Sequence, residues 1–155
     1  MEEQLLESEF VTYPIALRMK ALGFDKPCFS FYTLKNEENR IFYDIDPDDG
    51  QLTSLNQNAI YANNLSEVGR ISAPTLQSAL DWFEDNHQLY PSIVIDQTSY
   101  PKYAYEIARF VGNPKDLTEK EWYWDSMILS PNLYRTRLEA KIYCIEKLCE
   151  IAGEK

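Results

Sequence analysis

The segments whose apolar residues alternate as in β-strands occur in two closely spaced pairs. The first pair is CFSFYTL (28–34) and RIFYDI (40–45), and the second is PSIVID (91–96) and KYAYEIARF (102–110), which QTSY (97–100) connects. Short polar connections join antiparallel strands, whereas parallel strands need a crossover of about a dozen residues or more. The sequence therefore predicts antiparallel hairpins and argues against a doubly wound parallel fold.

Three other segments have the apolar spacing of helices. They are TYPIALRMKAL (12–22), the segment that follows Thr75, and a C-terminal segment that Ser130 and Pro131 would open. In the last of these, apolar side chains keep to one helical face, at Tyr134, Leu138, Ile142, Ile145, Leu148 and Ala152. The order α-β-β-α-β-β-α predicts an α+β fold, with a small antiparallel sheet of hairpin-paired strands and about three packed helices. We expect residues 1–155 to form a single domain.

Two segments leave the secondary structure open. Residues 51–71 are polar and asparagine-rich, which is consistent with a third strand or with a long loop. The segment EKEWYWDS (119–126) can form a short helix, because Thr118 and Glu121 have the spacing of a capping box, or it can run extended.

The net charge and the composition exclude several classes of partner and location. A net charge of −10 and a pI near 4.6 repel phosphate backbones, so we expect no nucleic-acid binding. Solubility alone accounts for such acidity, and a basic protein partner is the alternative. No apolar run approaches the ~18 residues that a membrane span needs, and the acidic start MEEQLLESEF lacks the layout of a signal peptide. Three cysteines without a CxxC pair argue against a disulfide framework. We therefore expect a cytoplasmic protein that does not contact membranes.

The only histidine, His87, follows Glu84 at the Glu-x-x-His spacing that helical di-iron proteins use twice. Counted at about 100° per residue, His87 continues an apolar stripe that starts at Leu76 and includes Phe83. One histidine cannot complete a di-metal site. We therefore favour a half-buried histidine that ends the helix, and we expect no metal or other cofactor.

Lys141 lies within the apolar stripe of the last helix, where the usual arrangement leaves the ammonium group in water. The three cysteines, Cys28, Cys144 and Cys149, are expected in the core. No glycine-rich phosphate loop or nucleophile motif accompanies them. A carboxylate-based enzyme that uses Glu84 with His87 or Lys141 stays as an alternative to a non-enzymatic protein.

An aromatic cluster is the first candidate for contact with a partner. Trp122, Tyr123 and Trp124 follow one another in a charged setting. Residues of this kind are usually buried in the core, and the alternative is that they anchor an interface with a partner. An extended path would place the two tryptophans on one face and Tyr123 on the other.

The acidic loop DIDPDDG (44–50) is the second candidate. It does not match a calcium-binding EF-hand loop, because Asp49 stands where that loop needs glycine. A solvated hairpin tip is therefore expected. Its carboxylates at Asp46, Asp48 and Asp49 are candidates for contact with a basic partner.

Three blocks of the sequence resemble a group of small uncharacterised acidic proteins encoded by phages and prophages of gut bacteria. The blocks are ALGFDKPCFSFY, SAPTLQSALDWFEDNHQLYPSI and LEAKIYCIEKLCEIA. The first two carry the shared pattern through Leu22, Gly23, Phe24, Asp25, Pro27, Cys28 and Phe29 and through Ala73, Pro74, Leu80, Asp81, Trp82 and Phe83. The resemblance implies a phage-related setting and an α+β fold, and it transfers no site residue.

Together these observations favour a small acidic protein that works by protein–protein contact rather than by catalysis. One form of this hypothesis is a modulator of a host protein that presents carboxylates to a basic groove. A homo-oligomeric assembly component is a further alternative, and the sequence leaves a monomer and a homo-oligomer equally open.

Overall fold

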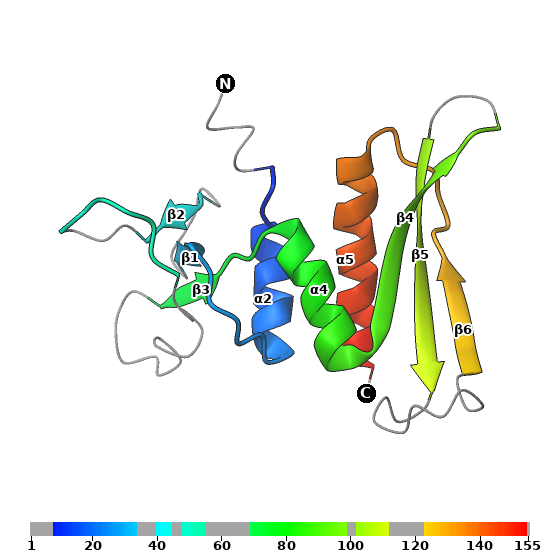
Figure 1. Cartoon of the computed structure of the whole chain (residues 1–155), viewed down its shortest axis with the longest axis horizontal. Coiled ribbons are helices and arrows are strands. Elements are labelled where there is room, and N and C mark those ends of the chain that lie inside the picture. The colour runs from blue at the N-terminus through cyan, green and yellow to red at the C-terminus, as the bar shows by residue number, and fades with distance from the viewer. Residues whose placement is uncertain are drawn as a thin grey trace. The chain divides into compact units, whose positions relative to one another are not determined.

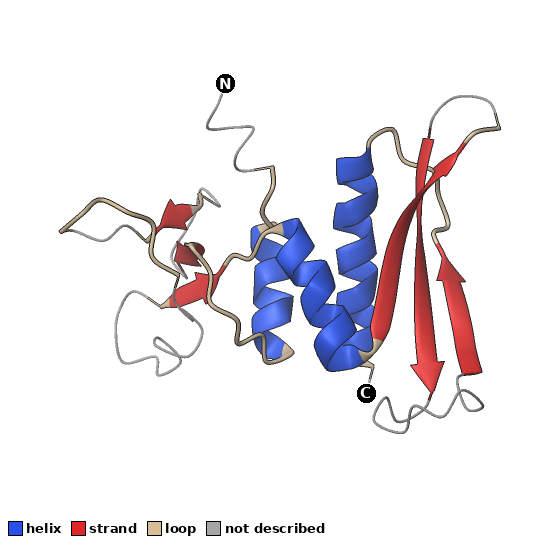
Figure 2. Cartoon of the chain, viewed as in Figure 1, coloured by secondary structure: helices blue, strands red, loops and turns tan. Residues whose placement is uncertain are grey.

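The computed structural model describes residues 8–33, 40–44, 48–54, 69–98, 102–111 and 123–154. These residues form three helices and six strands in the order α2-β1-β2-β3-α4-β4-β5-β6-α5 (Figure 1). The helices and strands are distinguished by colour in Figure 2. The α+β class is therefore confirmed, and the expected alternation of hairpins and helices is present.

The chain divides into two compact units, Met1–Ala79 and Leu80–Lys155, and the boundary falls inside α4. The strands form two antiparallel three-stranded sheets rather than one sheet, with the orders β2-β1-β3 and β4-β5-β6. Each hairpin that the sequence predicts thus gains a third strand. The expectation that residues 1–155 form one domain stays a prediction.

The first unit begins with helix α2 (Tyr13–Ala21), as the sequence predicts. Thr12 occupies the N-cap position without a side-chain cap hydrogen bond, and a proline stands in the first turn. After the helix, Gly23 adopts a φ of +90°, a conformation that glycine reaches without a steric penalty. This glycine therefore lets the chain turn away from the helix toward the first strand.

Strand β1 (Ser30–Thr33) is the centre of the first sheet, between β2 (Phe42–Tyr43) and β3 (Arg70–Ser72). Strand β3 confirms a third strand at the end of the polar segment 51–71. The Ser30 hydroxyl donates to the Ala73 carbonyl (2.7 Å), and hydrogen bonds of this kind satisfy buried polar groups.

Helix α4 (Leu76–His87) begins after Thr75, whose Oγ1 accepts a hydrogen bond from the Ser78 N–H at 3.1 Å. This is the N-cap arrangement that the sequence indicates. The helix ends at His87, and Gln88 with a φ of +55° then leads directly into β4.

The second sheet is a meander of β4 (Leu89–Asp96), β5 (Lys102–Val111) and β6 (Tyr123–Leu129). The extended alternative for EKEWYWDS is therefore correct for residues 123–126. Pairing with β5 fixes this strand, and the register shifts between Arg109 and Phe110.

Helix α5 (Arg137–Gly153) begins later than Ser130 and Pro131 suggest. Its first turn is a capping box, in which the Thr136 side chain accepts from the Glu139 N–H and the Glu139 side chain accepts from the Thr136 N–H. Tyr134 precedes the helix and forms a β-bridge with Tyr103 (N···O 2.7 and 2.9 Å). Placing Tyr134 in the helix was therefore wrong, because pairing with β5 keeps that residue extended.

The core of the second unit lies between α5 and one face of the sheet, because α5 contacts β4 and β5 (Figure 1). Ile145, Leu148 and Ala152 of the predicted stripe are buried, whereas Leu138 and Ile142 are only partly buried. The other buried residues of α5 are Ala140, Cys144, Cys149 and Ile151. Placing the cysteines in the core is confirmed for Cys28, Cys144 and Cys149.

Candidate interaction surface

The central strand β5 shows which face of the second sheet α5 covers. Tyr105 and Ile107 are buried, at 4% and 0% exposure, in the strand that α5 contacts. Because successive side chains of a strand point to opposite faces, Ala104, Glu106 and Ala108 belong to the other face. That face is called the open face below.

The strand register extends the open face across all three strands. Ala104 lies opposite Val94, and Ala108 lies between Tyr90 and Met127. Residues that lie directly opposite each other in an antiparallel pair share a face of the sheet. The apolar members of the open face are thus Tyr90, Val94, Ala104, Ala108, Met127 and Leu129.

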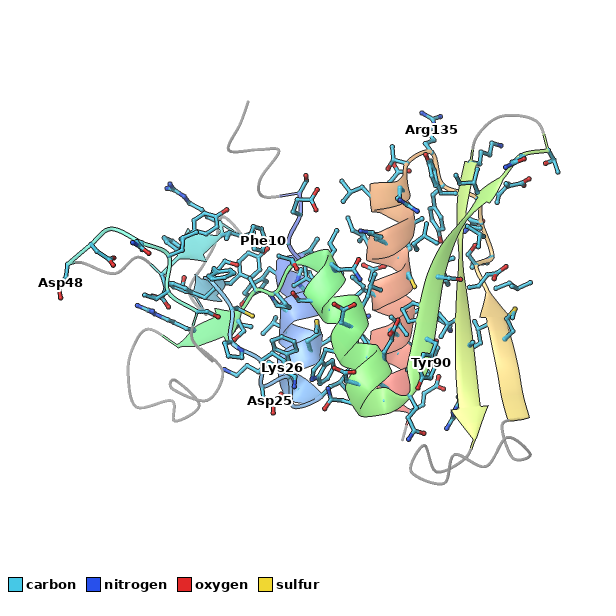
Figure 3. The ribbon with its side chains drawn as sticks, viewed as in Figure 1. Phe10, Asp25, Lys26, Asp48, Tyr90 and Arg135 are labelled. Atoms are coloured by element: carbon cyan, nitrogen blue, oxygen red, sulfur yellow. The ribbon has the colours of Figure 1, made fainter. Side chains whose placement is uncertain are left out.

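The open face is most exposed on β6, whereas Ala108 on β5 is buried at 7% exposure. Met127 and Leu129 on β6 are 57% and 61% exposed, while Tyr90 and Val94 on β4 are half-buried. Tyr90 stands near the start of β4 (Figure 3). An antiparallel sheet with one face on a core usually carries polar residues on the other. This face also carries polar residues, and its exposed large apolar side chains, Met127 and Leu129, make it a candidate surface for contact with another molecule.

One carboxylate lies at the centre of the open face. Glu106 occupies the middle of β5, with Ser92 opposite it on one side and Leu129 on the other. Farther along the face, Asp96 lies opposite Lys102. Hydrogen bonds from Thr98 are the main cause that lowers the pKa of Asp96, and the charge of Lys102 lowers it further. The ion pairs Arg70–Asp44 and Lys147–Glu150 do not involve Glu106.

Two residues of the aromatic cluster, Tyr123 and Trp124, belong to β6, the same strand as Met127 and Leu129. The backbones of Tyr123 and Trp124 pair with Val111 and Phe110 of β5, at the start of β6. Trp122 lies outside the described residues. The sequence interpretation missed Met127 and Leu129 on the same strand. The available signal was the run Met127–Ile128–Leu129, which gives both faces of a short strand apolar side chains.

The acidic loop belongs to the first unit, away from β6 in the sequence. Asp48 and Asp49 are exposed at a turn, where the Asp49 carboxylate accepts a hydrogen bond from the Gln51 N–H at 2.8 Å (Figure 3 labels Asp48). Asp46 lies outside the described residues. The two described carboxylates thus form a solvated turn, as the sequence indicates, and the structure adds no partner-binding geometry to them.

His87 is part of an aromatic cluster at the end of α4. Its ring centroid lies 4.7 Å from that of Trp82 and 5.5 Å from that of Phe83. Both neighbours are buried and His87 is half-buried, which confirms the interpretation of a packed histidine that ends the helix. Burial raises the pKa of the Glu84 carboxyl, and the nearby Asp81 and Asp85 raise it further.

The remaining group of the enzyme alternative is Lys141, and the cysteines are not part of that alternative. Lys141 is partly buried on α5. Burial raises the pKa of the Cys28 and Cys144 thiols to about 12, which removes the thiolate that nucleophilic catalysis needs. Within the described ranges, no group of three or more His, Cys, Asp or Glu side chains is placed to hold a metal ion.

Comparison with known proteins adds no assignment. No family model, curated protein or solved structure matches this chain. In the part of the chain that the structure describes, no helix combines the length and the apolar character needed to cross a membrane.

Proposed function

We propose that this chain is a protein-interaction module that binds a partner protein through the open face of the β4–β5–β6 sheet. The observation that carries the proposal is the pair of large apolar side chains, Met127 and Leu129, that stand more than half exposed on a sheet whose other face is covered by α5. Exposed side chains of this size contribute little to folding but provide apolar area to a partner.

The proposal keeps the non-enzymatic function that the sequence favours and places the contact on a different surface. The acidic loop around Asp48 and the chain's net charge of −10 support a partner with basic character, because opposite charges speed association. The phage-like setting and the role as a modulator of a host protein stay predictions.

The test compares two variants of one sheet. Met127→Asp with Leu129→Asp places two charges on the open face, whereas Ile95→Asp places one charge on a residue that is 50% exposed and lies in register with Tyr103, on the other face. The full chain is immobilised, and proteins captured from a lysate of the native cell are quantified by mass spectrometry. We expect a protein that wild type and Ile95→Asp retain equally and that the double variant loses at least ten-fold.

Two results would contradict the proposal. Retention of every captured protein by the double variant would exclude the open face as the binding surface. Light scattering provides the second readout. If wild type self-associates and the double variant is monomeric, the open face is an interface between copies of this chain, and the homo-oligomer alternative replaces the proposal. Circular dichroism of each variant confirms that its fold is intact.

A further inference from the structure

We propose that the element that occupies the open face is an amphipathic α-helix of the partner, with one lysine or arginine in the middle of its apolar stripe. This inference rests on the proposed function, since it specifies what the open face binds. It follows from the shape of the face, from its single central charge and from the length of its apolar part.

On the open face, the middle strand carries alanine at two positions, on either side of Glu106, and larger side chains lie on the neighbouring strands. Ala104 and Ala108 occupy β5, Val94 lies on β4, and Met127 and Leu129 lie on β6. Neighbouring strands are about 4.8 Å apart, so the two outer rows of side chains are separated by about 10 Å. A helix with its side chains is about 10–12 Å wide, so one helix would span the three strands of this face.

The charge of Glu106 selects among possible occupants. A purely apolar helix would cover this carboxylate without a partner, which costs free energy when a charge is buried. A second copy of this chain that packed face to face would bring two Glu106 side chains together, so like charges oppose self-association. A basic side chain on the partner helix would instead form a charge-assisted hydrogen bond with Glu106.

The backbone hydrogen bonds of the bound element also favour a helix over a strand. A strand would bind by adding to the edge of β4 or β6, where its backbone groups find partners, and not by lying across the side chains of the face. A helix satisfies its own backbone hydrogen bonds and presents an apolar stripe. The open face therefore fits an amphipathic helix that lies on it with its apolar stripe.

The spacing of the face defines the sequence of the helix. Ala104 and Ala108 are four residues apart, which is about 14 Å along a strand. A helix rises about 1.5 Å per residue, so two turns on one face, from i to i+7 or i+8, span about 10–12 Å and cover most of this distance. We expect apolar residues at positions i and i+7 or i+8 of the partner helix, and lysine or arginine at i+3 or i+4, above Glu106.

A yeast-displayed library of single helices tests this inference directly. The helices are built from alanine and glutamine, and positions i, i+3, i+4, i+7 and i+8 are randomised. Binders are selected on the full chain and counter-selected on the Met127→Asp, Leu129→Asp variant. We expect enriched sequences to carry a basic residue at i+3 or i+4, and Glu106→Gln to weaken their binding by about ten-fold. Glu154→Gln, at the exposed end of α5, is the matched control and should change nothing.

A parallel selection on Glu106→Lys should invert the central preference to aspartate or glutamate. Helices that need Met127 and Leu129 but carry no basic residue and tolerate Glu106→Gln would overturn the inference and leave the proposed function standing. Failure to enrich any helix that depends on the open face would also overturn it. The proposed function is judged separately, by the loss of captured partner in the double variant.

Discussion

Replacing Leu148 with alanine is expected to lower the free energy of unfolding by about 3 kcal/mol, whereas Leu129→Ala should change it by less than about 0.5 kcal/mol. Leu148 is fully buried on α5, and α5 packs on β4 and β5. Truncating this side chain removes its burial from water and leaves a cavity. Leu129 is 61% exposed on β6, so the same substitution there removes little buried area. Urea unfolding followed by circular dichroism measures both values.

The two leucine variants form a matched pair, since the chemical change is identical and only the location differs. A loss of stability at Leu129 comparable to that at Leu148 would show that the open face is covered within the chain, and it would remove the basis of the proposed function. If Leu129→Ala is as stable as wild type but binds the partner more weakly, one face of the sheet packs against α5 and the opposite face binds the partner.

The native thiols are expected to react with Ellman's reagent at pH 8 at about one-thousandth of their rate in the unfolded chain, or more slowly. Only the thiolate attacks the reagent, and an ordinary cysteine has a pKa of about 8.5. Burial raises the pKa of Cys28 and Cys144 to about 12, so at pH 8 their thiolate fraction falls by about three orders of magnitude. Cys149 is also buried, at 5% exposure. Absorbance at 412 nm follows the reaction in buffer and in urea.

The sign of the pH dependence follows from the same pKa shifts. Because the folded-state pKa is higher than the unfolded one, the folded chain keeps these protons as the pH rises above about 8.5, and stability then declines toward pH 12. Single Cys28→Ser and Cys144→Ser variants assign each reaction. Rapid reaction of one thiol in the native chain would show that its site is open to solvent, and it would make that cysteine a candidate nucleophile.

Local sequence patterns were sufficient to predict the helices and the two hairpins. The cap at Thr75 and the helix-ending Gly23 are short-range signals, because the residues that satisfy the backbone are neighbours in sequence. The predicted start of α5 was wrong. Ser130 and Pro131 look like a helix start, but the bridge between Tyr134 and Tyr103 holds the chain extended until the capping box at Thr136.

The third strand of the second sheet depends on distant contacts. The spacing of Thr118 and Glu121 matches a helix start, and only pairing with β5 shows that residues 123–129 form a strand. Local propensity cannot settle such a segment, because strand pairing joins residues that are far apart in the sequence.

The candidate site was largely beyond sequence reasoning for a related reason. The alternation of β5 separates Ala104, Glu106 and Ala108 from Tyr105 and Ile107, but it does not say which set α5 covers. That choice is made by tertiary packing. The acidic loop and the tryptophans were chosen as candidates because charge and aromatic content can be read directly from a sequence. The run Met127–Ile128–Leu129 shows apolar side chains on both faces of a strand, but the exposure of Met127 depends on which face α5 covers.

Photo-crosslinking from position 129 tests most directly whether the open face contacts the partner. Leu129 is replaced by the photoreactive amino acid p-benzoyl-L-phenylalanine in the full chain, and a second chain carries it at Ile95, which is similarly exposed on the other face. After irradiation with the captured partner, we predict a covalent adduct from position 129 and none from position 95. An adduct from position 95 without one from position 129 would contradict the proposed binding surface.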